Sequence, residues 1–216
     1  MAQQVNIRDT ALDALRALAI LWVVTIHAAS AGFSFPPGSF DWWGSLLWGA
    51  LARPAVPLFF LCSGALMLGR DIPLRRLYGH NILRIVAAML FWAFLYHLYH
   101  LLPGGLTLSG IWAAVKETLV LKHEPHFYFL HIMLLVYVFL PVTRAFLRRA
   151  SRRETEYFLA LWFVTGILFP LLQHFWPFTL VYPLSKWYTM NMAYAAIGYG
   201  VLGCYLRQYG GSIARR

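Results

Sequence analysis

Long apolar runs, separated by short charged or turn-forming connections, repeat along the whole chain. Six of these runs are of membrane-spanning length, since a helix needs about 20 mostly apolar residues to cross a bilayer. The runs are Leu12–Phe33, Ser45–Leu68, Ile82–Leu102, Phe127–Leu147, Tyr157–Phe175 and Met190–Leu206. Backbone groups in hydrocarbon need partners within the segment, so we expect each run to be a helix. The pattern predicts an all-α polytopic transmembrane helix bundle of about six helices.

The segment Thr107–Lys122, between the third and fourth runs, has a helical period but carries charges. Its apolar side chains share one helical face: Ile111, Trp112, Val115, Leu119 and Val120. Lys116 and Glu117 lie on the other side. This pattern predicts an interfacial amphipathic helix on the outer membrane surface, the alternative being a short seventh span with two charges.

The composition assigns the chain to the integral membrane proteins. Hydrophobic residues make up 60% of it and charged residues 12%. In a soluble protein, the net charge of +10 would indicate binding to nucleic acid. Here the arginines are instead concentrated in every second connection along the chain. They lie before the first run, around the connection from the second to the third, and after the fourth and sixth: Arg8, Arg70, Arg75, Arg76, Arg84, Arg148, Arg149, Arg152, Arg153, Arg207, Arg215 and Arg216. The positive-inside rule therefore predicts cytoplasmic termini for one membrane domain, residues 1–216, which contacts the lipid bilayer and no nucleic acid.

Cysteines and histidines give little support for a disulfide or a metal site. Cys62 and Cys204 lie inside apolar runs, so neither a disulfide framework nor a cysteine metal site is implied. Most histidines fall on the expected outer side: His27, His97, His100, His123, His126, His131 and His174. Imidazole is a common metal ligand, but no H-E-x-x-H pattern occurs and only Glu124 is an acidic neighbour. Interfacial placement is the commoner explanation, and no metal is expected.

The first run carries Arg16 near its start and His27 near its end. Their separation of 11 positions is close to three helical turns, so both project from nearly one face, roughly 16 Å apart along the axis. Asp13, one turn before Arg16, can balance its charge. A charge inside a span is costly enough to indicate function. Two alternatives stay open: a snorkelling arginine with a core histidine, or a signal peptide cleaved near Ala29–Ala31, which Asp9 and Asp13 fit poorly.

Arg53 lies in the outer third of the second run, within the sequence RPAVPLFFLCSG. Pro54 and Pro57 remove backbone donors and loosen the helix there. Ser63 and Gly64 then form a small notch that another backbone or a ligand could approach. A kinked span with a snorkelling arginine is the alternative to a functional site.

Four stretches together resemble the membrane-bound acyltransferase family 3. LDALRALA with His27 matches the family's arginine, ten residues, histidine pattern, and Arg53–Gly64 matches its second-span motif. Arg84 in NILRI and the stretch HFYFLHIMLLVYVFLPVTR, residues 126–144, resemble its third-span arginine and its fourth-span motif. Within the family the chain is most similar to O-acetyltransferases of surface glycans, such as the enterobacterial common antigen type.

The resemblance implies an enzyme of the bacterial inner membrane. Such an enzyme transfers an acetyl group from cytosolic acetyl-CoA to a hydroxyl of a surface or lipid-linked carbohydrate, and its partners are then the donor and this glycan. His27, as base or acyl carrier, and Arg16 are the implied catalytic residues. Arg53, Ser63 and Arg84 are implied in donor binding. His126 and Tyr128 are implied in acceptor binding, and a homo-oligomer stays open.

The resemblance also predicts more helices than the chain provides. Members of this family usually have about ten spans, so we expect the chain to be the N-terminal part of a longer bundle or a shortened member. The alternative function is a transporter or flippase fragment whose buried arginines and histidine line a substrate path. A third interpretation is a structural membrane subunit in which polar groups only hold helices together.

Overall fold

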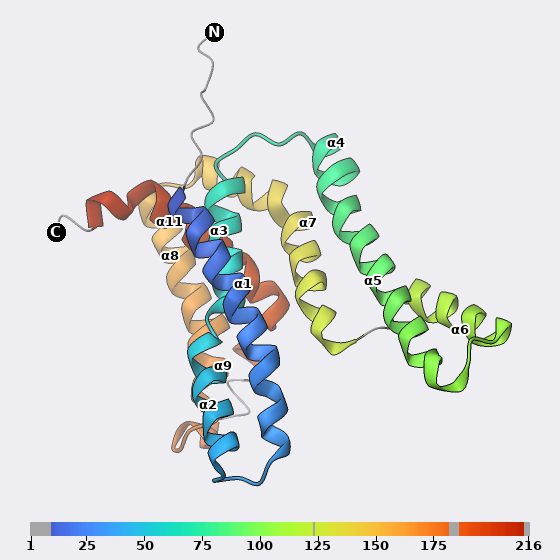
Figure 1. Ribbon diagram of the computed structural model, residues 1–216. Coiled ribbons are helices and arrows are strands. Elements are labelled where there is room, and N and C mark those ends of the chain that lie inside the picture. The colour runs from blue at the N-terminus through green and yellow to red at the C-terminus, as the bar shows by residue number, and fades with distance from the viewer. Residues whose placement is uncertain (1–9, 123, 182–185, 214–216) are drawn as a thin grey trace. The chain divides into compact units, whose positions relative to one another are not determined.

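A computed structural model describes residues 10–122, 124–181 and 186–213, in which helices are joined by turns and no strand occurs (Figure 1). The chain forms two compact units. The first consists of Met1–Gly69 with Gly198–Arg216, and the second of Arg70–Ile197. Helix α11, Met192–Ile213, begins in the second unit and continues into the first.

The first unit is built on a hairpin of α1 with α2 and α3. Helix α1 covers Thr10–Ser30, the short 3-10 helix η1 covers Ala31–Ser34, and α2 covers Phe40–Ala52. Ser39 caps α2, because its side-chain oxygen accepts a hydrogen bond from the Trp42 N–H. Helix α1 packs against both α2 and α3.

The expected kink in the second run is a two-residue turn between two helices. Arg53 ends α2, Pro54 starts the next helix, and α3 covers Ala55–Met67. Proline is tolerated at a helix start because the first N–H groups have no partner within the helix. The prolines of this run therefore divide it into α2 and α3.

Glycines let α3 and α11 approach until their backbones touch. A Cβ atom at Gly64 would clash with the backbone of Gly200, and one at Gly203 would clash with the backbone of Leu61. Arg207 adds a hydrogen bond from Nη1 to the carbonyl oxygen of Ala65, 3.0 Å away. Small residues at such contacts are the usual means of close helix packing in membranes. The notch at Gly64 is thus filled by another backbone, which is one of the two occupants that we expected.

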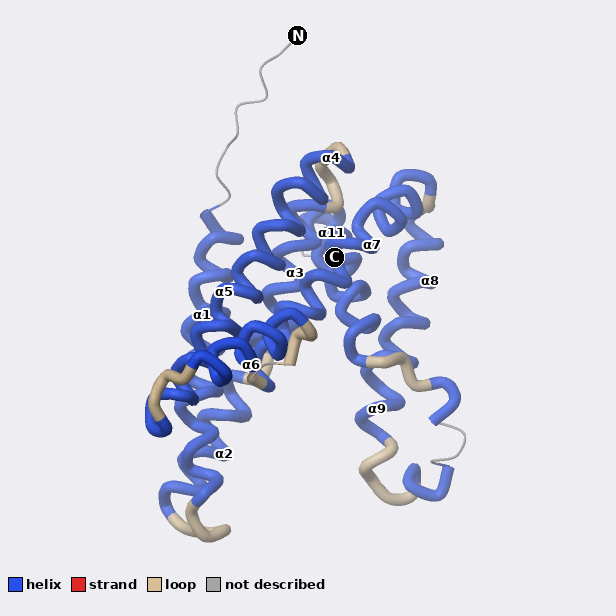
Figure 2. Tube along the Cα trace, turned by 90° about the vertical axis from the view of Figure 1, so that its right-hand side faces the viewer, coloured by secondary structure: helices blue, strands red, loops and turns tan. Residues whose placement is uncertain are grey.

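The second unit contains the remaining helices, joined by short connections (Figure 2). They are α4 (Leu74–Arg76), the π-helix η2 (Leu77–Ile82), α5 (Leu83–Leu101), the 3-10 helix η3 (Leu102–Gly104), α6 (Leu108–Leu119), the 3-10 helix η4 (Pro125–Phe127), α7 (Tyr128–Arg149), α8 (Arg152–Phe163), the π-helix η5 (Val164–Leu168), α9 (Phe169–Leu172) and the 3-10 helix η6 (Phe178–Val181).

Two caps define helix starts in this unit. Thr107 caps α6 by accepting a hydrogen bond from the Gly110 N–H, at 3.1 Å. Ser151 and Glu154 form a reciprocal capping box at the start of α8. Only Ala150 and Ser151 connect α7 with α8, so the chain reverses direction at this cap.

The all-α prediction is confirmed, and the described residues include five helical segments that are long and apolar enough to span a membrane. These segments are Thr10–Ser34, Phe40–Met67, Leu74–Gly104, Tyr128–Arg149 and Arg152–Leu172. The sixth expected span, Met190–Leu206, falls on α11, which is helical but is not among these five. The predicted amphipathic helix is present as α6.

Candidate functional site

Helix α1 carries both Arg16 and His27 without interruption. It is a continuous α-helix from Thr10 to Ser30. The separation of 11 positions is therefore about three helical turns, which places both residues on nearly one face. Both side chains are exposed, whereas Ala19 on α1 is fully buried. The face with the cation and the imidazole is therefore accessible within the first unit.

His27 lies in the last turn of α1, next to a local stabilising contact. The Ser30 hydroxyl donates a hydrogen bond to the carbonyl oxygen of His27, at 2.7 Å. A cavity of about 260 Å³ opens between this end of α1 and the start of α2. Thr25, Ala28 and Ala29 line it from α1, and His27 does not. The imidazole thus lies close to this cavity in sequence but on another side of the helix.

Arg53 and Ser63 belong to the first unit together with Arg16 and His27. The Arg53 N–H bonds to the carbonyl oxygen of Ala50, at 3.3 Å, and its side chain is exposed where α2 ends. Ser63 is half-buried in α3, directly before the glycine that contacts α11. Arg53 therefore lies at the interruption between α2 and α3, and Ser63 lies beside the close contact of α3 with α11.

Arg84, His126 and Tyr128 belong to the second unit. Arg84 is exposed in the first turn of α5, directly after the π-helix η2. Segments of π-helix are rare and are frequent at functional sites. Neither composition nor periodicity indicated this segment in the sequence.

His126 lies within an aromatic cluster that joins α5 to the start of α7. Its ring packs edge-on against Tyr96 and Phe127, with centroids 5.3 Å and 4.8 Å apart. Phe127 is buried and also contacts Tyr96, whereas Tyr128 is exposed. A cavity of about 250 Å³ is lined by Tyr96 and its neighbours on α5: Trp92, Leu95, Tyr96 and Tyr99.

Ionisable side chains hold α6 and the following connection to the end of α5. His97 donates from Nε2 to the carbonyl oxygen of Lys122 at 2.6 Å, and its Nδ1 lies 3.4 Å from the Glu117 carboxylate. Lys122 Nζ donates to the same carboxylate at 2.5 Å. His100 donates from Nε2 to Glu124, at 2.7 Å. No local sequence pattern predicts this network, because its histidines and their partners lie 24 and 25 positions apart.

The charge of Glu117 is stabilised within this network. The hydrogen bond from Lys122 lowers the pKa of Glu117 below its ordinary value of 4.5, against an opposing effect of burial. The charges of Lys122 and His97 add to the lowering. Across the described residues, no group of three or more His, Cys, Asp or Glu side chains is placed to hold a metal ion, and His123 lies outside them.

Arg144 and Arg148, near the end of α7, bind the connection that precedes α4 through Ile72 and Asp71. Arg144 is only 7% exposed and donates from Nη1 to the carbonyl oxygen of Ile72, at 3.2 Å. Arg148 forms an ion pair with Asp71. Arg144 ends the stretch that resembled a family motif, but sequence analysis assigned it no role.

Comparisons with known proteins gave one match. A family model described as an acyltransferase domain matches residues 9–216, which is nearly the whole chain. A search of curated proteins found no match, and neither did a search of solved structures.

Proposed function

Because the chain belongs to the acyltransferase 3 family and is therefore assigned to acyl transfer, we propose that it moves an acetyl group from acetyl-CoA to a carbohydrate hydroxyl. The carbohydrate is a cell-surface or lipid-linked glycan. The observation that carries this proposal is the unbroken helix α1, which presents Arg16 and His27 on nearly one exposed face within a family match of residues 9–216.

His27 supplies the proton transfer that this reaction needs. Imidazole titrates near neutral pH and can accept the proton of a sugar hydroxyl as its oxygen attacks the thioester carbonyl. The C–S bond breaks, CoA leaves as thiolate and takes up the proton, and the acetyl ester remains on the sugar. In the second version, the imidazole nitrogen attacks the thioester first and loses its proton to the CoA thiolate, which leaves. The sugar hydroxyl then attacks the acetylimidazole, the ester forms, and the hydroxyl proton returns to the released imidazole.

Three arginines suit the anionic donor and the charge of the transition state. Guanidinium groups bind phosphates through paired hydrogen bonds, and Arg53 and Arg84 are both exposed. Arg16 shares its helix face with His27, where a fixed cation stabilises the oxyanion that develops on the thioester carbonyl. Ser63, half-buried in α3, adds a hydroxyl on the donor side.

The aromatic cluster around His126 supports an acceptor site. Binding sites for small molecules are mostly lined by aromatic and apolar side chains with a few polar groups, and this cluster combines rings with imidazole and phenol groups. Tyr128, exposed at the start of α7, adds a further phenol. We place the acceptor on the outer face of the bacterial inner membrane, since the arginine-rich connections favour cytoplasmic termini.

Transfer of label from acetyl-CoA tests the function directly. Membranes with the chain receive radiolabelled acetyl-CoA, and lipid-linked and surface glycans are extracted and counted. We expect label in glycan from the wild type, none above background from His27→Ala, and wild-type levels from His174→Ala, a matched histidine outside the site. Glycan that crosses the membrane without acquiring label would favour the transporter interpretation instead.

A further inference from the structure

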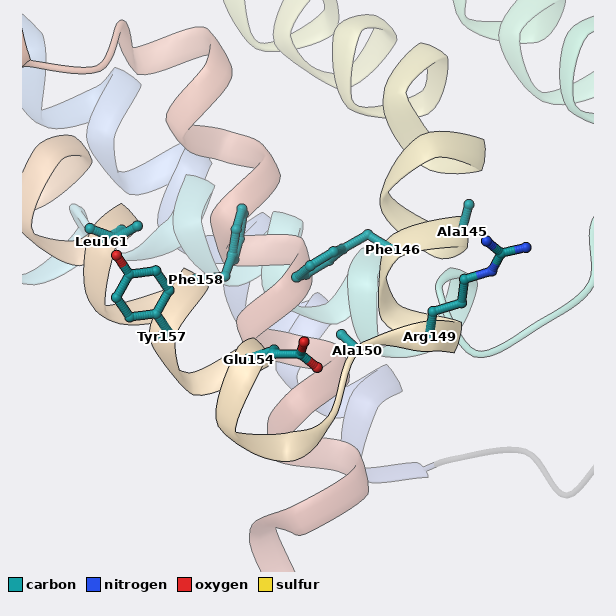
Figure 3. A pocket seen from close by; sticks show the side chains of 8 residues that line it. All are labelled: Ala145, Phe146, Arg149, Ala150, Glu154, Tyr157, Phe158 and Leu161. Atoms are coloured by element: carbon teal, nitrogen blue, oxygen red, sulfur yellow. The ribbon is translucent and has the colours of Figure 1, made fainter.

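A cavity of about 490 Å³ opens between the end of α7 and the start of α8 (Figure 3). Its lining comes from one face of each helix: Ala145, Phe146, Arg149, Ala150, Glu154, Tyr157, Phe158 and Leu161. Both helices belong to segments that are long and apolar enough to span a membrane, and the cavity lies where these segments end. None of the residues assigned to acyl transfer lines it.

The walls of this cavity are mainly apolar. Phe146 and Phe158 point towards each other, with ring centroids 5.5 Å apart (Figure 3). Leu161 and Tyr157 are 48% and 67% exposed, so large apolar surface stays open beside this ring pair. Ordered water, at roughly 30 Å³ per molecule, needs several polar partners that such walls do not provide. The cavity therefore suits a hydrocarbon chain.

The lining holds one cation and one carboxylate, Arg149 and Glu154, and only the cation is open to a ligand. Glu154 is engaged at the cap of α8, where its carboxylate accepts a hydrogen bond from the Ser151 N–H at 2.6 Å. Three neighbouring arginines have partners: Arg144 bonds to Ile72, Arg148 pairs with Asp71, and Arg152 pairs with Glu156, whereas Arg153 is exposed and does not line the cavity. Arg149 has no such interaction among the residues that the structure describes, and its guanidinium lies beside Ala145 at the rim (Figure 3).

We propose that this cavity binds an anionic phospholipid. An acyl chain lies over Phe146, Phe158 and Leu161, and the phosphate accepts hydrogen bonds from the Arg149 guanidinium. The end of a span is the depth at which headgroups lie, and arginines at that depth attract anionic lipids. Arg149, the one cation in the lining, lies above mainly apolar walls, which matches a single phosphate on a hydrocarbon tail. The several phosphates of acetyl-CoA would need more cations than this cavity offers.

Reconstitution into nanodiscs tests the proposal with phosphatidylglycerol as the probe, in a phosphatidylcholine background. Bound lipid is counted by native mass spectrometry, and unfolding temperature is measured in both lipids. We expect retained phosphatidylglycerol that stabilises the wild type, with affinity about fivefold weaker in Arg149→Gln. Arg153→Gln removes the same charge next to the cavity without altering its lining, so it should stay near the wild-type affinity. Leu161→Trp should also weaken binding, because it fills the cavity and leaves the charge unchanged.

Each other outcome overturns the proposal. Equal losses in Arg149→Gln and Arg153→Gln would show diffuse attraction to the membrane surface. Protection by acetyl-CoA of the wild type but not of Arg149→Gln would make the cavity a donor site. No retained phospholipid in the wild type would leave the cavity to another protein segment. The unfolding temperatures of the variants in phosphatidylcholine should equal that of the wild type, which shows that the variants are folded. The lipid measurement does not depend on whether the protein transfers acyl groups.

Discussion

Two helix pairs in this protein are held together by different physical means. Helices α3 and α11 meet through glycines whose backbones touch, whereas α6 is joined to α5 through histidines, carboxylates and a lysine. The first contact depends on the absence of side-chain volume, and the second depends on charge and protonation. The two contacts should therefore respond to different changes. Added side-chain volume should disturb the α3–α11 contact, and acid should disturb the α5–α6 contact.

The largest effect should come from added volume at the glycine crossing. In Gly64→Leu the new side chain begins with a Cβ that clashes with the backbone of Gly200, so the helices must separate. We expect a loss of about 3 kcal/mol in the free energy of unfolding, measured by unfolding in detergent. Gly49→Ala is the matched control in α2, because a Cβ at Gly49 meets open space. A wild-type stability for Gly64→Leu would contradict the close crossing.

A smaller effect should follow the loss of the carboxylate that joins α6 to its neighbours. Glu117→Gln removes the partner of Lys122 and the negative charge beside His97. We expect faster amide hydrogen exchange in α6 and a lower unfolding temperature, but less lowering than in Gly64→Leu. Lys116→Gln changes a charge on the same helix without touching this network, and its exchange should resemble the wild type. Equal exchange in all three proteins would show that packing alone holds α6.

Acid should loosen the same contact in the wild type. The pKa of Glu117 is lowered in the folded state, so its contribution to stability is fully present above the ordinary value of 4.5. That contribution decreases below 4.5 and is lost as the pH falls through the lowered folded pKa. Amide exchange of α6, followed from neutral pH downward, should therefore rise in acid. The rise should be smaller in Glu117→Gln, and exchange at the α3–α11 crossing should stay unaffected by Glu117.

The smallest effect on stability should come from His27, although it carries the proposed chemistry. Its side chain is exposed on α1, and exposed substitutions usually change the free energy of unfolding by no more than about 0.5 kcal/mol. We expect His27→Ala to unfold within this range of the wild type while acetyl transfer is lost. A large loss of stability would instead assign His27 a structural role.

Most of the helical architecture could be predicted from the sequence, because apolar length and backbone satisfaction in hydrocarbon leave few alternatives. The unbroken helix between Arg16 and His27 and the amphipathic helix α6 followed from local periodicity. The sixth expected run forms helix α11, which is not among the five segments of the described residues that are long and apolar enough to span a membrane. Sequence analysis allowed close packing at Gly64 but could not identify Gly200 as the partner.

The candidate site was less predictable because its contacts join distant positions. His97 and Lys122 are 25 positions apart, and nothing in local pattern pairs them. The cavity beside Arg149 depends on how the faces of α7 and α8 meet after the turn at Ser151, which no hydropathy pattern encodes. Roles for Arg16, His27, Arg53, Ser63, Arg84, His126 and Tyr128 stay predictions, and the labelling experiment addresses that of His27.

The crossing of α3 with α11 also has a consequence for biosynthesis. The bond from Arg207 to Ala65 joins residues 142 positions apart, so α3 enters the membrane long before its partner is synthesised. Until then the glycine surface of α3 faces lipid or other segments, and the first unit cannot be completed. A ribosome stalled before α11 would therefore hold a chain whose first helices are inserted but still open to quality-control proteases.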